Sequence, residues 1–366
     1  MLKDNDAISE NQLMQVLILT IMGVGVVSLP REVAEIWGAS GWMLVILGGL
    51  LALVQALIIT ALAKRFPDRT FPEYSVDIAG KFIGTAVALL IAVYFMLVTV
   101  FQARIIGDVI KLFLLFDTPI EVIIVTIMAV VLYLVRNGIE PITRVAVIIL
   151  PLLVFGAFLL LIPAFSGADF SNLLPLVPDN IPAVFRGITT ISFSFLGYES
   201  LLLLIPFTAK PKHLNKTVSK AMVIVMLIYL VICIIVFIEF GVAETKSLIW
   251  PLFSLMKAVE IPGAFVERLE GIFLSLWVFA VFSTMMMTYF CAYFILGKVI
   301  GLKQPRILAV PLFPVIYILA MIPRNVVVVY EYLGYFTKTF GTLVAGIIPV
   351  IFLILAVIRK KRDAHG

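Results

Sequence analysis

The sequence predicts an all-α membrane protein with ten transmembrane helices in two five-helix inverted repeats, the first and sixth helices being broken. Three observations predict this fold class. Hydrophobic residues make up 63% of the 366 residues and charged residues only 13%, about half the share found in soluble domains. The charged residues gather between ten long apolar runs. Glycines interrupt the first and sixth runs, at Gly23-Val24-Gly25 and Gly197-Tyr198-Glu199.

Each apolar run is a candidate for one membrane crossing, which needs about 20 apolar residues. The runs are Leu13–Ile36, Gly41–Ala63, Phe82–Phe116, Ile120–Val135, Arg144–Ile162, Ile181–Phe207, Val218–Phe240, Ala264–Ile300, Ile307–Ile322 and Tyr335–Ile358. The third and eighth exceed a hydrocarbon core of about 30 Å, so we expect them to tilt or project beyond it. The fourth and ninth are short and depend on their neighbours. A separate short helix at the outer surface of the membrane is expected at Arg324–Leu333.

The basic residues predict the orientation. An even number of spans puts both termini on one side, and connections on that side hold 18 of the 27 Lys and Arg residues. The positive-inside rule makes that side cytoplasmic. The net charge of +5 follows from this asymmetry. The sequence predicts that the protein lies in the lipid bilayer. It predicts no nucleic-acid partner, because it has no folded basic domain that could bind one.

The spans divide into two halves within a single transmembrane domain that covers residues 1–366. Five helices cover about 11–162 and five cover about 181–358. Because five is odd, the second half has inverted topology. Broken first and sixth helices in such a repeat are typical of LeuT-type transporters, whose ligands bind near the bilayer midplane.

The break in the first helix is a candidate binding site for a carboxylate. Gly23 and Gly25 lower helix propensity and let a ligand approach the backbone. Free N–H groups at the start of a half-helix carry partial positive charge and suit an anion. The alternative is close packing of small residues between helices, although glycines two positions apart do not share a helix face.

The break in the sixth helix contains Glu199, near the bilayer centre by residue count. An ionised carboxylate there is costly unless it is paired or hydrated. Three roles remain open for it. Glu199 could bind the ammonium of an amino acid or amine, it could titrate as a coupling group, or it could accept hydrogen bonds from freed N–H groups of the half-helix.

The third and eighth helices carry further candidates. Tyr94 and Val98 lie on one face of the third helix with Phe101 and Gln102. Arg104 and Asp108, four positions apart, are expected to form a structural ion pair. On the eighth helix the candidates are Ser283, Thr284, Met287 and Thr288. The hydroxyls could instead bond to their own backbone, and the methionine could fill the core.

No pattern indicates an enzyme, a cofactor or a metal site. The sequence has no Ser/His/Asp, Cys/His, P-loop or H-E-x-x-H arrangement. Cys233 and Cys291 lie inside apolar runs, which argues against a disulfide framework. His213 and His365 are isolated in basic segments.

The chain resembles the spore germination permease family, the B subunits of germinant receptors. The resemblance is carried by an ordered set of motifs: I-S-x-x-Q (Ile8, Ser9, Gln12), G-V-G-V-V-S-L-P (Gly23–Pro30), the basic F-P loop (Lys64–Pro67), R-N-G-I-E (Arg136–Glu140) and F-L-G-Y-E (Phe195–Glu199). The resemblance implies a LeuT-type fold of the amino acid–polyamine–organocation superfamily. It also implies an A-type membrane subunit and a C-type lipoprotein as partners in the spore inner membrane.

The resemblance further implies a pocket for a small amino acid or similar nutrient between helices one, three, six and eight. Its residues would be Gly25, Tyr94, Val98, Leu196, Thr284 and Met287. We therefore expect a germinant-sensing subunit. A proton-coupled amino-acid permease is the first alternative, and an ion-conducting or scaffold subunit is the second.

Overall fold

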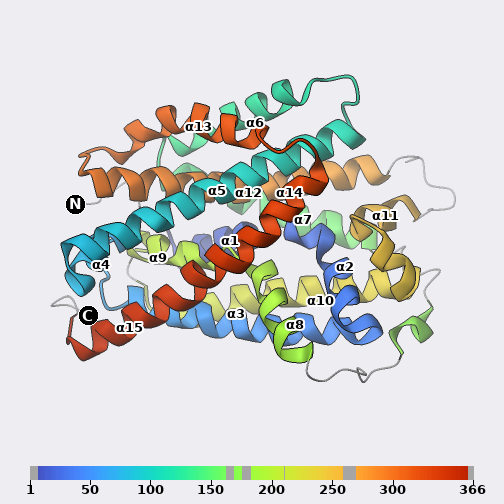
Figure 1. The fold of residues 1–366 in the computed structure, drawn as a ribbon, viewed down its shortest axis with the longest axis horizontal. Coiled ribbons are helices and arrows are strands. Elements are labelled where there is room, and N and C mark those ends of the chain that lie inside the picture. The colour runs from blue at the N-terminus through green and yellow to red at the C-terminus, as the bar shows by residue number, and fades with distance from the viewer. Residues whose placement is uncertain (1–6, 162–168, 175–182, 210, 259–268, 362–366) are drawn as a thin grey trace.

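The computed structural model is a bundle of long helices that lie roughly side by side (Figure 1). It describes residues 7–161, 169–174, 183–209, 211–258 and 269–361. About 85% of the described residues are helical. The all-α membrane fold class is thereby confirmed. The ends of several expected spans, at Ile162, Ile181 and 264–268, lie outside the described residues.

The long helices follow the apolar runs closely. In chain order the α-helices are α1 (Glu10–Ile21), α2 (Gly25–Trp37), α3 (Trp42–Ala63), α4 (Phe71–Ala79), α5 (Lys81–Phe113), α6 (Ile120–Val135), α7 (Ile139–Leu161), α8 (Ala183–Ser192), α9 (Leu201–Leu204), α10 (Leu214–Ser247), α11 (Pro251–Ala258), α12 (Leu269–Ile300), α13 (Ala309–Met321), α14 (Val326–Phe336) and α15 (Ile348–Ile358). Among them, α6 begins and ends where the sequence predicted.

Six described helical stretches are long and apolar enough to cross a membrane. A seventh is the bent pair Gly187–Phe195 and Tyr198–Phe207, whose halves meet at 58°. Two shorter apolar helices, Ile120–Val135 and Pro305–Met321, fall below that length. The protein is thus a multi-pass membrane protein, while the count of ten spans stays a prediction.

The first and sixth spans are broken at the predicted glycines. The first divides into α1 and α2 around Met22–Val24. The sixth runs through α8 and the 3-10 helix η5 (Phe193–Phe195), then resumes at η6 (Tyr198–Ser200), α9 and η7 (Ile205–Phe207). Gly197 sits at this break with φ of 129°, a conformation that side chains disfavour.

The stretch Arg324–Leu333 is not the separate outer helix that the sequence suggested. Its residues enter α14, which continues through the π-helical segment η9 (Thr337–Ile347) into α15 as one apolar stretch, Val326–Ile358. The helix begins because the Asn325 side chain accepts a hydrogen bond from the Val328 N–H at 3.0 Å. π-helical turns are rare and are frequent at functional sites.

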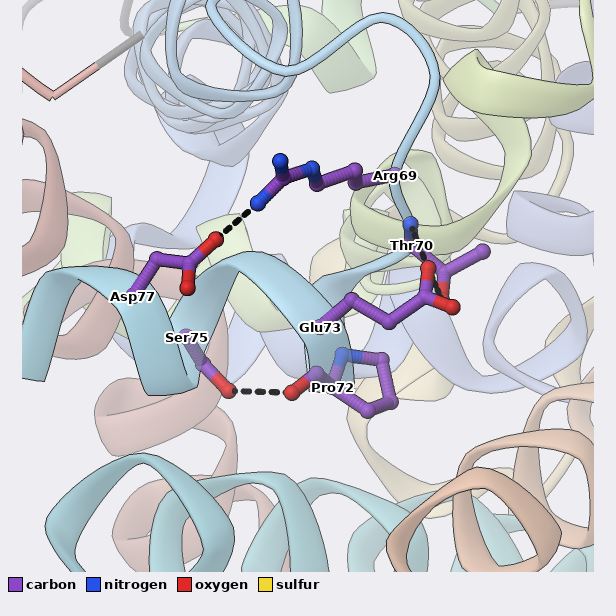
Figure 2. Close-up of polar contacts among 6 residues, drawn as sticks. All are labelled: Arg69, Thr70, Pro72, Glu73, Ser75 and Asp77. Carbon is purple, nitrogen blue, oxygen red and sulfur yellow. Dashed lines mark hydrogen bonds and ion pairs between the residues drawn. The ribbon is translucent and has the colours of Figure 1, made fainter. Parts of the chain in front are cut away.

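The short helix α4 lies at the end of the bundle where α15 ends (Figure 1). Figure 2 shows how it starts: the Glu73 carboxylate accepts hydrogen bonds from the Thr70 N–H and hydroxyl, both at 2.8 Å. Arg69 pairs with Asp77 on the next turn. Glu73 also pairs with Lys298 of α12 at 2.9 Å. Burial alone would raise the pKa of Glu73, but the bonds to Thr70 and Lys298 outweigh burial and hold this pKa below its ordinary value.

The segment before α1 is fastened to the end of the sixth span. The Ile8 N–H donates to the Phe207 carbonyl and the Ala209 N–H donates to the Ile8 carbonyl, each at 2.9 Å. The Glu10 carboxylate accepts from the N–H groups of Lys212 and His213, at 2.6 and 2.7 Å. We call this set of bonds the terminal clasp. It holds the two broken spans together on the side where α15 ends.

Candidate functional site

A cavity of about 590 Å³ lies between the broken spans, α5, α12 and the last long helix. Its wall includes both breaks, the middle of α5 and the second half of α2. It also includes residues of α14 and η9, such as Tyr330 and Lys338. The cavity therefore extends from the centre of the molecule away from the terminal clasp. Its volume is within the range of about 300–1,000 Å³ typical of ligand pockets.

The two helix ends at the first break differ in how their polar groups are satisfied. The hydroxyl of Thr284 donates to the carbonyls of Leu19 and Thr20 at 3.0 and 3.3 Å. The Tyr229 hydroxyl donates to the Ile21 carbonyl at 2.9 Å. The carbonyl end of α1 is therefore already occupied. In contrast, α2 begins at Gly25 with no side chain among the described residues capping its N–H groups. Such an uncapped end favours an anion.

At the sixth-span break the corresponding position is filled by the protein itself. One Glu199 oxygen accepts from the Gly197 N–H at 2.7 Å, and the other accepts from the Tyr94 hydroxyl at 2.8 Å. Glu199 is 1% exposed. Of the three roles left open for Glu199, this geometry favours the structural one, because both oxygens already serve the helix break and α5.

The middle of α5 supplies an aromatic and amide wall. Tyr94 stacks on Phe336 with ring centroids 5.3 Å apart. Further along α5, Gln102 is 7% exposed and its amide oxygen is buried without a hydrogen-bond partner among the described residues. A Cβ added to Gly23 would come within 2.9 Å of the Gln102 amide nitrogen and of the Thr284 hydroxyl. Only glycine lets these polar groups approach the break so closely.

The structure brings together seven of the nine sequence-predicted site residues. The seven that line the cavity are Gly23, Gly25, Tyr94, Val98, Leu196, Glu199 and Thr284. Ser283 and Met287 lie on the neighbouring face of α12: Ser283 donates to the Phe279 carbonyl at 2.9 Å and Met287 is fully buried. Thr284 and Thr288, four residues apart, face the cavity instead. Ligand binding by any of these residues stays a prediction.

One further expectation for the helices is resolved by a distance. The Arg104–Asp108 ion pair is confirmed, with 3.0 Å between guanidinium and carboxylate, and Arg104 also donates to the Ala320 carbonyl. Cys233 and Cys291 are buried and free.

Sequence reasoning missed the polar residues on α2. Ser28 and Glu32 line the cavity from the first and second turns of α2. Their spacing of four positions, starting three residues after Gly25, places them on one helix face and could have indicated them. Ser194, which follows Thr190 by four positions in the sixth span, also lines the cavity.

The helical bundle and its two facing breaks define a multi-pass membrane protein with the LeuT-type fold. The structure of MhsT in complex with L-phenylalanine matches with a TM-score of 0.75 over 96% of this chain and 89% of that chain. The two sequences are only 16% identical, so this likeness concerns the fold.

The family is identified by sequence. A family model described as spore germination protein matches residues 7–328, and the chain belongs to this family. Spore germination protein YndE of Bacillus subtilis is 32% identical over 95% of this chain and 96% of its own length. Spore germination protein B2 of the same organism is 31% identical over 96% of this chain and 97% of its own.

Proposed function

We propose that this protein is the nutrient-sensing membrane subunit of a spore germinant receptor, with a small amino acid or similar nutrient bound in the central cavity. The observation that carries the proposal is the unequal capping of the two breaks. Glu199 supplies a carboxylate to the Gly197 N–H at the sixth-span break, whereas the start of α2 has no such partner among the described side chains. A ligand carboxylate at Gly25 would complete the pattern.

The rest of the wall suits a small zwitterion. The buried Gln102 amide and the Thr288 hydroxyl supply polar groups near the break, while Val98 and Leu196 supply apolar surface. Pockets with a mostly apolar lining and few polar groups orient small ligands. Met287 has no part in this arrangement, because it packs on the neighbouring face of α12.

Receptor assembly belongs to the same proposal. We expect an A-type membrane subunit and a C-type lipoprotein as partners in the spore inner membrane, with both termini cytoplasmic and the two inverted repeats at about 11–162 and 181–358. Ligand binding must favour one arrangement of the bundle to transmit a signal. The terminal clasp is one of the described contacts between the broken spans that such a change would alter.

Isothermal titration of purified protein with L-amino acids tests the pocket. In Gly25→Leu the backbone is accommodated, since an added Cβ meets its nearest atom, the Ser194 carbonyl oxygen, at 3.5 Å. The rest of the leucine side chain enters the cavity, so we expect loss of binding. Gly271→Leu is the matched control because no atom of the described residues lies within 4 Å of its added Cβ. Equal affinity in wild type and Gly25→Leu would refute the location.

The permease alternative is favoured by the likeness in fold to MhsT. Uptake of a labelled amino acid into proteoliposomes under a pH gradient distinguishes transport from sensing. Uptake that requires the gradient and disappears in Glu199→Gln would support a proton-coupled permease. An ion leak without saturable ligand binding would support a conducting or scaffold subunit instead.

A further inference from the structure

Glu32 is a carboxylate in the cavity wall that the proposed function does not use. One of its oxygens accepts from the Ser28 hydroxyl at 2.9 Å and the other accepts from the Ser194 hydroxyl at 3.1 Å. Neighbouring Arg31 pairs with Glu35 at 2.8 Å. Among the described residues, Glu32 has no basic partner within ion-pair distance. The hydrogen bonds to its carboxylate therefore come from neutral hydroxyls.

A carboxylate inside a membrane protein is costly unless a cation or several strong donors accompany it. Glu199 meets that requirement with a backbone N–H group and a phenol. Glu32 likewise has one donor on each oxygen, here a serine hydroxyl, and each oxygen can accept a second hydrogen bond. Unlike Glu199, which is 1% exposed, Glu32 is only half-buried. In the same cavity, the buried amide oxygen of Gln102 has no hydrogen-bond partner among the described residues. This is an independent indication that the polar part of the cavity wall binds a ligand.

Distance decides which part of a ligand could reach Glu32. Seven residues separate Gly25 from Glu32, which is about 10 Å along the helix axis, and the side chain of Glu32 tilts back toward the break. The α-ammonium of an amino acid is joined to the same carbon as its carboxylate. With the carboxylate at Gly25, that ammonium stays beside the break, and only a group at the end of a long side chain spans the remaining distance.

We propose that Glu32, with Ser28 and Ser194, forms a second subsite that binds the cationic end group of an elongated amino acid. The ligand class is an L-amino acid with a terminal ammonium or guanidinium. The inference rests on the proposed function, since it takes the ligand carboxylate to lie at the start of α2. A cavity of about 590 Å³ has room for such a side chain.

Lys338 is the competing partner for Glu32. It lies on η9, lines the same cavity and is exposed, without an ion pair to Glu32 in this structure. A shift of η9 toward α2 would bring the two charges together without any ligand. The experiment must therefore separate a ligand cation from the lysine.

The test is titration calorimetry on the full chain in lipid nanodiscs with L-lysine and L-norleucine, which share a carbon chain but differ in the terminal ammonium. A charge-assisted hydrogen bond predicts at least about tenfold tighter binding of L-lysine. Glu32→Gln should abolish that preference by weakening L-lysine, with L-norleucine unaffected. Glu35→Gln removes a charge that is already paired one turn further on, so its effect should be clearly smaller.

Each contrary result has a distinct meaning. If L-norleucine binds as tightly as L-lysine, the second subsite is wrong and the proposed function stands. If neither binds, the second subsite is wrong, and the proposed function also fails if no other L-amino acid binds in the titration series. Equal weakening of both ligands in Glu32→Gln would make Glu32 a structural residue. A preference for L-lysine that is seen only in Lys338→Met would show that Glu32 pairs with Lys338 in the wild type. That result would overturn the inference.

Discussion

Replacing Gly197 by alanine should loosen the contact between the two breaks. Gly197 has φ of 129°, and a Cβ there would lie 2.8 Å from the Thr20 carbonyl oxygen and 3.0 Å from the Ile21 Cα. The backbone conformation costs about 1–3 kcal/mol for a non-glycine residue, and forced overpacking costs about 1–3 kcal/mol more. Because the atoms that clash are main chain, no side-chain rotation relieves them.

Together these terms predict a loss of about 2–6 kcal/mol. With an unfolding entropy of about 2.1 cal/mol/K per residue over 366 residues, the midpoint of thermal unfolding should fall by about 3–8 °C. Scanning fluorimetry of the protein in detergent measures this. Gly271→Ala on α12 is the control, since its added Cβ meets no atom within 4 Å in the part of the chain that the structure describes. If Gly197→Ala has the same midpoint of thermal unfolding as the wild type, the two breaks do not pack as described.

Three further predictions concern single contacts. Tyr94→Phe removes a donor from buried Glu199 and should cost about 1–3 kcal/mol of stability, whereas Tyr133→Phe, at a 73% exposed residue, should cost little. Gly84→Ala would put a Cβ 2.5 Å from the Ser75 carbonyl oxygen, separating α4 from α5 with a cost of about 1–3 kcal/mol. Because its pKa is lowered in the folded protein, Glu73 should stabilise the protein above its ordinary pKa of 4.5 and lose that contribution as the pH falls further.

Thermal unfolding measured from about pH 6 to about pH 3 checks the prediction for Glu73. The midpoint of the wild type should fall more steeply below pH 4.5 than that of Glu73→Gln. Parallel curves would contradict the role assigned to the Glu73–Lys298 pair. Wild-type stability in Tyr94→Phe would likewise contradict the account of Glu199.

The positions of the breaks could be predicted because glycines inside an apolar run weaken the helix at one defined point. The register of α12 had no such marker. Ser283 and Thr284 are adjacent, about 100° apart around a helix, and apolar neighbours on both sides left open which of them faces the cavity. Thr288 was a named candidate that the structure places on the cavity.

Other parts of the structure carry no local signal in the sequence. The π-helical segment η9 contains two glycines and three threonines, which weaken an α-helix without specifying wider turns, so the π-helical geometry could not be predicted from them. The polar face of α2 did have a signal, since Ser28 and Glu32 are one turn apart. That signal is weak by itself, because the same spacing is common on helix faces that contact water.

The terminal clasp is joined at position 8 through main-chain atoms alone, because Ile8 uses its own N–H and carbonyl to reach Phe207 and Ala209. The two bonds themselves therefore need no particular side chain, but the Ile8 side chain is fully buried in the core, so an apolar residue is required there. Proline is the exception, since it has no N–H to donate. Ile8→Pro would therefore break the hydrogen bond between position 8 and the Phe207 carbonyl while every residue that lines the cavity is left unchanged.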